Sequence, residues 1–361
     1  MKVLAALSGG VDSAVAAARA VEAGHDVTAV HMALTKSKEE YRTGSRGCCS
    51  LEDSADARRA AAILGIPFYV WDLSEEFEKT VIDDFLNEYE QGRTPNPCVR
   101  CNEYVKFKSL LDRGIALGFD AVCTGHYAQI LEGEAGLELH RSINDLKDQS
   151  YVLAVIGREN VSKVLFPIGN METKDAVRAE AAQRGLSVSN KPDSYDICFI
   201  SDGDTAGFLR SKLGAKSGEI LDTEGNVVGQ HEGYFAYTVG QRRGLALGRP
   251  AKDGKPRYVL STIPAKNQVI VGSNELLSVN TIEGNDPIWL CDKSEYSSRF
   301  TAAVQMRAHG KQVPCEIELT AEKVIAHLDE SAHGIAAGQS MVIYDGTRVV
   351  GQVTISKAYK S

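Results

Sequence analysis

The sequence predicts an α/β protein in which a parallel-sheet domain is followed by a small middle domain and a C-terminal β-barrel. In the first third of the chain, short apolar runs alternate with alanine-rich amphipathic segments, as in strand–helix–strand units. Closely spaced glycines follow, and toward the end apolar and polar residues alternate with period two. The length of 361 residues fits two or three domains, which we expect at 1–207, 208–278 and 279–361.

The elements of the first domain are expected from apolar periodicity and from residues that start or stop helices. Ser50 and Asp53 frame one helix start, and Gly24 and Gly65 follow two helix ends. Thr94–Pro97 cannot continue a helix and is expected as a loop. The expected strands are Lys2–Leu7, Asp26–Met32, Pro67–Trp71 and Asp120–Thr124, and the expected helices are Ser13–Ala23, Ser50–Gly65 and Glu75–Gln91.

Turn residues dominate the rest of the chain. From about Phe208, glycines such as Gly214 and Gly218 separate segments too short for a further strand–helix unit. After about Val279 the alternation has period two, and Asp345-Gly346 between two apolar runs predicts a hairpin turn. These signals predict the middle domain and the barrel.

Composition excludes several classes of protein. Lys and Arg number 40 against 48 Asp and Glu, a net charge of −8, which argues against a broadly basic DNA-coating protein. Eight cysteines are too few for a disulfide-stapled secreted scaffold. No apolar run approaches the roughly 18 residues that a membrane span needs. We therefore expect a cytoplasmic protein without a membrane partner.

The strongest local signal is Ser8-Gly9-Gly10-Val11-Asp12-Ser13, between a predicted strand and a predicted helix. Glycines admit an anion close to the backbone, while amide groups, the helix N-terminus and the two serine hydroxyls attract phosphate. Asp12 is a candidate ligand for magnesium. The loop lacks a Gly-Lys-Ser/Thr ending and a Gly-x-Gly-x-x-Gly pattern, so it is neither a Walker loop nor a dinucleotide fingerprint.

These six residues resemble the signature of the PP-loop ATP pyrophosphatases, which have an adenine nucleotide α-hydrolase-like domain. The resemblance implies that ATP is cut between its α and β phosphates, leaving AMP on a substrate oxygen. The superfamily contains amidating synthetases as well as tRNA-modifying enzymes, so the loop alone leaves the acceptor open.

Three cysteines form a candidate reactive set. Cys98 and Cys101, directly after Thr94–Pro97, are expected in one loop, and Cys198 is expected in a second loop. A thiolate is a strong nucleophile that nearby cations favour, and Arg100, Lys106 and Lys108 are close in sequence. A zinc site would need four ligands, which the pattern does not supply. Cys123, Cys291 and Cys315 are expected to be buried apolar residues, and Cys48 and Cys49 are expected to pack or to form a thiol pair near the ATP site.

Seven blocks in order resemble the bacterial tRNA-specific 2-thiouridylases, the MnmA/TrmU family, over nearly the whole chain. They are Ser8–Ser13, Thr94–Lys108, Gly125–Tyr127, Lys147–Tyr151, Leu165–Pro167, Ile197–Ile200 and Tyr237–Arg242. The resemblance implies that ATP adenylates the C2 oxygen of the wobble uridine of tRNA and that sulfur then displaces AMP. Cys198 matches the cysteine that carries a persulfide, and Cys101 matches the partner that closes a disulfide with it. The partners implied are tRNA and a persulfide donor such as a cysteine desulfurase or a sulfur carrier.

The same resemblance assigns two groups of binding residues. Positions implied for ATP are Ala6, Leu7, Ser8, Gly9, Gly10, Val11, Asp12, Ser13, Met32 and Gly125. Positions implied for tRNA are His126, Lys147, Asp148, Gln149, Arg307 and Gln339.

Two positions depart from the family pattern. Cys98 stands where the family commonly has aspartate, a candidate general acid or base, so another group takes that role or the chemistry differs. Cys98, Cys101 and Cys198 also resemble the three ligands of a [4Fe–4S] cluster in related thiolation enzymes. Ala308 follows Arg307 where the family tends to have an aromatic residue, which leaves phosphate contact to Arg307 and puts stacking in doubt.

Two clusters of basic residues could bind tRNA phosphates although the protein as a whole is acidic. They are Arg93, Arg100, Lys106, Lys108 and Arg113 near the cysteines, and Arg242, Arg243, Arg249, Lys252, Lys255 and Arg257 in the middle domain. Tyr234, Phe235 and Tyr237 could stack on a flipped base or fill the core of a small β domain. Two alternatives stay open: an amidating PP-loop synthetase, and a non-catalytic RNA-binding or iron–sulfur protein.

Overall fold

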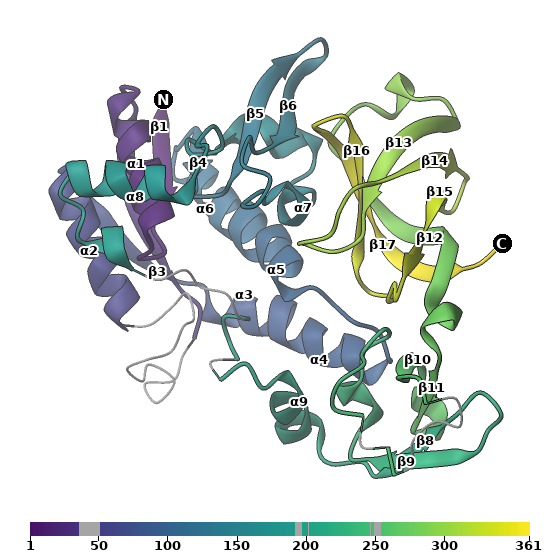
Figure 1. The fold of residues 1–361 in the computed structure, drawn as a ribbon. Coiled ribbons are helices and arrows are strands. Elements are labelled where there is room, and N and C mark those ends of the chain that lie inside the picture. Colours follow the sequence, from purple (N-terminus) through teal and green to yellow (C-terminus); the bar gives the residue numbers. More distant parts are fainter. Residues whose placement is uncertain (36–50, 192–196, 201, 246, 249–253) are drawn as a thin grey trace.

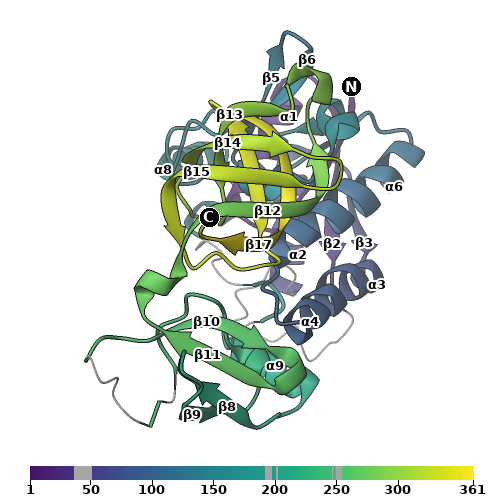
Figure 2. The same ribbon diagram turned by 90° about the vertical axis from the view of Figure 1, so that its right-hand side faces the viewer.

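The protein is described by a computed structural model that covers residues 1–35, 51–191, 197–200, 202–245, 247–248 and 254–361. Cys48, Cys49, Asp196, Arg249 and Lys252 lie outside these residues. Figures 1 and 2 show a helix-covered parallel sheet beside a β-barrel, with a small sheet below both. The predicted fold class is confirmed.

The sheet of the first domain is parallel, with the strand order β3-β2-β1-β4-β7 among the described residues. Side chains of β1 alternate between its two faces, as a strand requires. Val3 and Ala5 pack in a core with α1 and α2, whereas Leu4 and Ala6 pack in a core with the helical run after the cysteines. The strands are β1 (Lys2–Ala6), β2 (Asp26–Ala33), β3 (Phe68–Asp72), β4 (Ala121–Cys123) and β7 (Val164–Leu165).

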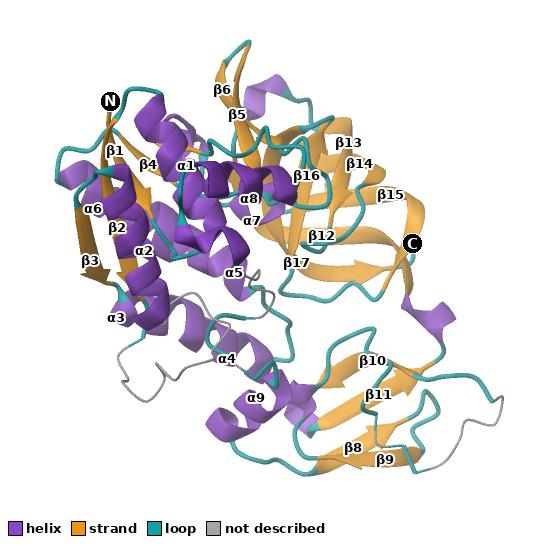
Figure 3. Ribbon diagram, turned by 60° about the vertical axis from the view of Figure 1, so that its left-hand side comes forward, coloured by secondary structure: helices purple, strands orange, loops and turns teal. Residues whose placement is uncertain are grey.

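Helices cover both faces of this sheet (Figure 3). The first core is covered by α1 (Val11–Glu22), α2 (Leu51–Leu64) and α8 (Lys174–Gln183), with η4 (Ser187–Asn190) beside them. The second is covered by α3 (Ser74–Phe77), η1 (Glu78–Ile82), η2 (Cys101–Leu110) and α6 (Leu111–Ala116), of which η1 and η2 are π-helical. The helix α4 (Asp83–Glu90) continues η1, and α5 (Pro97–Arg100) precedes η2.

Two helix predictions need adjustment. The expected helix Glu75–Gln91 exists, but the π-helical η1 interrupts it. The prediction of a loop over Thr94–Pro97 is wrong at its end, because Pro97 is the first residue of α5. Proline suits that position since its missing N–H needs no partner there, and the Asn96 side chain caps the helix.

The middle of the chain forms a small sheet with the order β10-β11-β8-β9 in its described residues. Phe85 and Tyr89 of α4 enter its core, which ties the sheet to the first domain. Its elements are α9 (Thr205–Leu213), β8 (Gly218–Leu221), β9 (Val227–His231), η5 (Tyr234–Ala236), β10 (Tyr258–Ile263), η6 (Pro264–Lys266) and β11 (Gln268–Gly272).

The C-terminal part, which the structure describes in full, closes into an antiparallel barrel because β12 pairs with both β15 and β17. The hairpin predicted at Asp345-Gly346 joins β16 to β17, and Gly346 has φ +59°. The elements are η7 (Asn274–Leu277), β12 (Ser278–Trp289), η8 (Lys293–Glu295), β13 (Arg299–Gln305), β14 (Val313–Leu319), β15 (Val324–His333), β16 (Ser340–Asp345) and β17 (Arg348–Tyr359).

A hairpin that follows β4 in the chain extends the barrel sheet. Strands β5 (Ala128–Gly133) and β6 (Gly136–Arg141) follow β17 in the strand order, and His140 pairs with Arg348. Tyr344 and Val349 of the barrel share a core with Phe107 and with α7 (Ser150–Leu153), near η3 (Arg158–Lys163). The barrel and the sheet domain are therefore packed as neighbours.

Within the described ranges, no helix combines the length and the apolar character needed to cross a membrane.

Candidate nucleotide and thiol site

The predicted phosphate loop lies between the end of β1 and the start of α1. Gly10 is the N-cap residue of α1 and supplies no side chain as a cap. The hydroxyl of Ser13 donates to the carbonyl of Gly10 at 3.0 Å, and the amide of Ser8 donates to Ser13 Oγ at 3.2 Å. These bonds hold the loop, and the uncapped start of α1 directs positive partial charge toward an anion.

Two glycines make the loop possible. Gly9 has φ +82°, and a Cβ there would lie 2.3 Å from the carbonyl oxygen of Asp53. A Cβ on Gly125, just after β4, would lie 2.5 Å from the amide nitrogen of Ser13. Only glycine permits either approach. The structure thus brings Gly125, predicted for ATP, directly against the loop.

The other residues predicted for ATP shape the surroundings of this loop. Ala6, Leu7 and Val11 are buried, and Met32 is half-buried near the end of β2. The carbonyl of Leu7 lies 2.8 Å from Nδ1 of His31. Burial lowers the pKa of His31, although that backbone bond acts in the opposite direction. His31 is therefore neutral at pH 7 and carries no charge toward a phosphate.

Two lysines reach the loop from distant parts of the chain. Lys174 of α8 lies 2.5 Å from Oδ2 of Asp12, whose Oδ1 accepts from the Tyr127 hydroxyl at 2.8 Å. Lys191 donates to the carbonyl of Gly9 at 3.1 Å and to carboxylates of α2, Asp53 and Asp56, at 2.6 and 2.7 Å. Sequence analysis missed both lysines, since each lies more than 160 residues from its partner in the loop.

The cysteines occupy a helix and a turn. Cys98 is exposed in α5, whose cap Asn96 accepts from the amide of Cys98 at 3.1 Å. Cys101 starts η2 and is 9% exposed. The expectation that Cys98 and Cys101 lie in a loop is wrong, because helix formation begins at Pro97.

Cys101 and Cys198 share an apolar cluster. Cys198 lies in a turn, is half-buried and packs with Phe199 against the cluster that contains Cys101. Cys123, Cys291 and Cys315 are buried elsewhere, as expected, and burial raises the pKa of the Cys123 thiol to about 12. The two thiols predicted to react thus border one apolar cluster, whereas burial raises the pKa of each of the three other thiols.

The described residues show no metal-binding group at the cysteines. Among the described residues, no three Cys, His, Asp or Glu side chains are grouped to hold a metal ion. Cys98 is exposed and Cys101 is buried. We derive no step through an iron–sulfur cluster.

His126, predicted for tRNA, is buried. It is 7% exposed, with Nδ1 2.7 Å from Thr124 Oγ1 and Nε2 3.3 Å from Lys106 Nζ. Burial and the neighbouring Lys106 hold the pKa of His126 well below its usual range. Its ring is therefore neutral.

The neighbouring residues predicted for tRNA make contacts within the chain. The carboxylate of Asp148 accepts from the amide of Ser142 at 2.9 Å and from Arg141 Nε at 3.0 Å. Gln149 accepts from the amide of Tyr127 at 3.0 Å, and Lys147 is half-buried. Asp148 and Gln149 thus hold the segment that leads away from Gly125.

Arg307 and Gln339, the barrel residues predicted for tRNA, also contact the protein itself. Arg307 donates to the carbonyl of His333 at 3.1 Å. Gln339 donates to the carbonyls of Thr94 at 2.7 Å and Pro95 at 3.2 Å. These two residues lie immediately before α5 and η2, which we call the cysteine helix because they contain Cys98 and Cys101. The barrel therefore contributes to the placement of the cysteines.

Acidic partners neutralise much of the first basic cluster. Arg93 Nε donates to Glu88 at 2.7 Å, and Arg100 pairs with Glu103 at 2.9 Å and with Asp84 at 3.3 Å. Arg113 stacks on Trp71 at 4.3 Å. Arg93 and Arg100 are thus paired with carboxylates, and Arg113 lies over an aromatic ring.

The middle domain has exposed arginines and buried aromatic side chains. Arg242 and Arg243 are exposed. Tyr234 and Phe235 are 4% and 1% exposed, so they fill the core, as the second interpretation of these aromatics expected. Neither can stack on a base.

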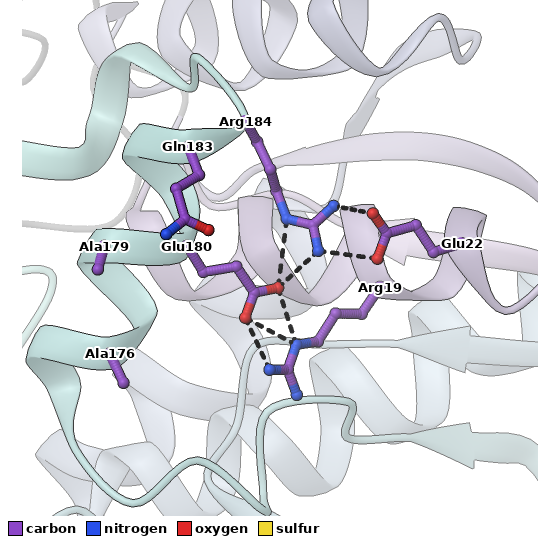
Figure 4. A pocket seen from close by; sticks show the side chains of 7 residues that line it. All are labelled: Arg19, Glu22, Ala176, Ala179, Glu180, Gln183 and Arg184. Carbon is purple, nitrogen blue, oxygen red and sulfur yellow. Dashed lines mark hydrogen bonds and ion pairs between the residues drawn. The ribbon is translucent and has the colours of Figure 1, made fainter.

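A surface hollow between α1 and α8 is separate from the loop (Figure 4). Arg19 and Arg184 both pair with Glu180, and Arg184 also pairs with Glu22. Arg19 and Glu22 lie in the last turns of α1, at the end opposite the phosphate loop. The hollow is charge-balanced and is not part of the candidate site.

Comparison with sequence families gives matches over nearly the whole chain. Residues 1–202 match a model described as the tRNA methyl transferase HUP domain. Residues 206–273 match the tRNA methyl transferase PRC-barrel domain, and residues 279–355 match the aminomethyltransferase beta-barrel domain.

Curated relatives match along nearly their full length. The tRNA-specific 2-thiouridylase MnmA of Beutenbergia cavernae is 63% identical, covering 99% of this chain and 95% of its own. That of Acidothermus cellulolyticus is 56% identical, covering 100% and 99%. A solved 4-thiouridine synthetase–RNA complex with bound ATP aligns with 59% of this chain and 50% of its own, with a TM-score of 0.36 and 15% identity.

Proposed function

This chain belongs to the tRNA-specific 2-thiouridylase family, and from that premise we propose that it converts the wobble uridine of tRNA to 2-thiouridine at the expense of ATP. It is an ATP-dependent tRNA-uridine 2-sulfurtransferase. The observation that carries the proposal is the convergence of the phosphate loop and two thiols on one sheet domain in a chain 63% identical to such an enzyme.

The first step is activation of the uridine. The loop Ser8–Ser13, with Ala6, Leu7, Met32 and Gly125 around it, binds ATP through backbone amides and the start of α1. The C2 oxygen of uridine attacks the α-phosphorus, the bond to the β-phosphate oxygen breaks, and pyrophosphate leaves. Adenylation is needed because an oxygen bound to C2 is otherwise a poor leaving group.

The second step is sulfur transfer. A persulfide on Cys198 presents its terminal sulfur to C2, and AMP leaves with the bonding electron pair. The Cys101 thiolate attacks the Cys198 sulfur, so the persulfide S–S bond breaks, the sulfur stays on C2 and a Cys101–Cys198 disulfide forms. Their common apolar cluster supports this pairing. A dithiol reductant outside the chain restores both thiols.

The finer assignments complete this proposal. His126, Lys147, Asp148, Gln149, Arg307 and Gln339 lie where tRNA approaches, and their contacts within the chain support an indirect role in shaping that surface. A cysteine desulfurase or a sulfur carrier supplies the persulfide in the cytoplasm, where tRNA is found. Magnesium enters with ATP, and Asp12 would have to leave Lys174 to bind it.

The test is a 2-thiouridine assay on unmodified tRNA with ATP and a persulfide donor, using protein purified without oxygen. We expect iron-free wild type to be active, and the variants Cys101→Ser and Cys198→Ser to release pyrophosphate but form no 2-thiouridine. Cys315→Ser, a buried cysteine of the barrel, is the matched control.

Three other outcomes would contradict the proposal. Activity of Cys198→Ser with ammonia as the nitrogen donor would favour an amidating synthetase. Absence of tRNA-dependent pyrophosphate release would favour a non-catalytic RNA-binding protein. Stoichiometric cluster iron, with activity lost when it is removed, would replace the persulfide relay.

A further inference from the structure

Lys106 is a half-buried cation whose contact is a neutral ring. It lies on η2, and its Nζ is 3.3 Å from Nε2 of His126. Among the described residues, no carboxylate oxygen lies within 4.0 Å of Lys106 Nζ, the distance limit for an ion pair. The neighbouring lysine of the same helix, Lys108, has such a partner in Asp112 at 3.9 Å. Removing a cation from water is unfavourable unless an anion compensates it.

The imidazole of His126 is the hydrogen-bond acceptor of this ammonium. An ammonium group only donates, so Nε2 of His126 accepts from Lys106 and Nδ1 carries the proton. Nδ1–H then donates to Thr124 Oγ1 at 2.7 Å. The rings of Phe107 and Phe166 lie 6.0 and 5.9 Å from the imidazole and fix its plane. The direction of the Lys106 ammonium is therefore set by a buried, immobile acceptor.

Through its contact with His126 and its place on η2, this ammonium is connected to both halves of the site. His126 directly follows Gly125, whose Cα packs against the start of α1 at Ser13. On its other side, Lys106 belongs to the helix that Cys101 begins. The loop amides face the phosphates and the thiols supply sulfur, so the atoms shared by both steps must lie between them. Those shared atoms are the uridine C2 oxygen and the α-phosphate.

We propose that Lys106 binds the α-phosphate of ATP, the phosphate that stays on the uridine oxygen after adenylation, and that His126 positions it. The inference rests on the proposed function and adds a residue to its first step. As the C2 oxygen attacks, negative charge on the α-phosphate oxygens is offset by the ammonium, pyrophosphate takes the electron pair, and the uridine N3 proton passes to water. Lys106 keeps its proton throughout.

The experiment measures tRNA-dependent pyrophosphate release in single turnovers, with ATP and with the two diastereomers of ATPαS. For Lys106→Met we expect release to slow on the order of 10²-fold, with partial recovery in Lys106→Arg. We also expect wild type to discriminate between the diastereomers and Lys106→Met to lose that discrimination. His126→Phe keeps the ring volume but removes the acceptor, and we expect about a tenfold loss. Lys79→Met, an exposed lysine of η1, is the control.

Other results would overturn the inference. If Lys106 binds a tRNA backbone phosphate instead, Lys106→Met would weaken tRNA binding, reduce its salt dependence by about one ion and leave the diastereomer preference intact. An unchanged release rate in Lys106→Met would also refute it. Failure of wild type itself to thiolate tRNA would reject the proposed function, so the two failures are distinguishable.

Discussion

The side-chain amide of Gln339, in the barrel, donates to the carbonyl oxygen of Thr94 at 2.7 Å. A second bond from the same nitrogen reaches Pro95 at 3.2 Å, and the amide of Thr94 donates to the carbonyl of Ala337 at 2.8 Å. Cys98 follows only three residues after Pro95. The C-terminal domain therefore fixes the backbone from which the cysteine helix begins.

Gln339→Ala removes both of these side-chain bonds. We expect a loss of about 1 kcal/mol in the free energy of unfolding, and slower 2-thiouridine formation with an unchanged KM for ATP. Gln129→Ala is the control, because Gln129 donates to the carbonyl of Arg141 at 2.8 Å in the β5–β6 hairpin, away from the cysteines. Equal thiolation rates in the two variants would show that the barrel does not position the cysteine helix.

Gly125→Ala places a methyl group 2.5 Å from the Ser13 amide nitrogen. The start of α1 must move, so we expect ATP affinity to fall by more than about tenfold, with about 1–3 kcal/mol of destabilisation. Gly24→Ala, at φ +79° with nothing near its Cβ, costs stability but should leave ATP binding intact. Calorimetric titration with ATP measures the difference, and equal affinities would remove Gly125 from the site.

Lys191→Met removes the cation shared by Asp53, Asp56 and the carbonyl of Gly9. Asp53 and Asp56 are each 8% exposed, whereas the Lys191 side chain is 26% exposed, so we expect a loss of about 2 kcal/mol in urea unfolding. Arg59→Met is the control, since Arg59 also pairs with Asp56 but its side chain is 56% exposed. Similar losses in both variants would show that the Lys191 contacts add nothing specific.

Stability should fall as the pH drops below about 6.5, the ordinary pKa of histidine. Burial lowers the pKa of His31, His126 and His231 in the folded protein, so the unfolded chain binds protons first. The stability from their neutral forms is complete above that pH and is lost as it falls toward their folded pKa values. Each proton contributes at most about 1.4 kcal/mol per pH unit. Unfolding at pH 7.5, 6.5 and 5.5 tests this, and His126→Phe should reduce the slope.

Cys98→Asp restores the carboxylate typical of the family at the second residue of α5. A negative charge in the first turn should stabilise the helix by about 0.3–1 kcal/mol. We expect 2-thiouridine formation at least as fast as in wild type, because Cys98 is exposed and lies outside the Cys101 cluster. A loss of activity that Cys98→Ser also shows would instead give the thiol itself a catalytic role.

Local signals predicted much of the sheet domain. The apolar run Lys2–Leu7 and the glycines at 9 and 10 predicted β1, the loop and α1 within a few residues, because strand burial and phosphate binding both leave local patterns. Pro97 was misassigned because proline both ends and starts helices, and only the cap from Asn96 decides between the two.

Long-range contacts could not be predicted from the sequence. Lys174 and Lys191 look like surface lysines, and only the fold brings them to Asp12 and Gly9. The pairing of Arg93 with Glu88 and of Arg100 with Asp84 likewise neutralises two members of a basic cluster, which counting charges along the sequence does not reveal. Whether a charged side chain is neutralised depends on where its neighbours lie in the fold, and neither composition nor periodicity reveals this.

The β5–β6 hairpin is translated well before the strand with which β6 pairs in the barrel sheet. His140 lies 2.9 Å from the hydroxyl of Thr347, a residue 207 positions later in the chain. At a translation rate of about 5–20 residues per second, the ribosome adds Thr347 at least about ten seconds after His140. Until then the edge of β6 has no neighbour, and exposed edges invite pairing with other chains. Nascent chains stalled before β17 should therefore be the species most prone to aggregate and most dependent on chaperones.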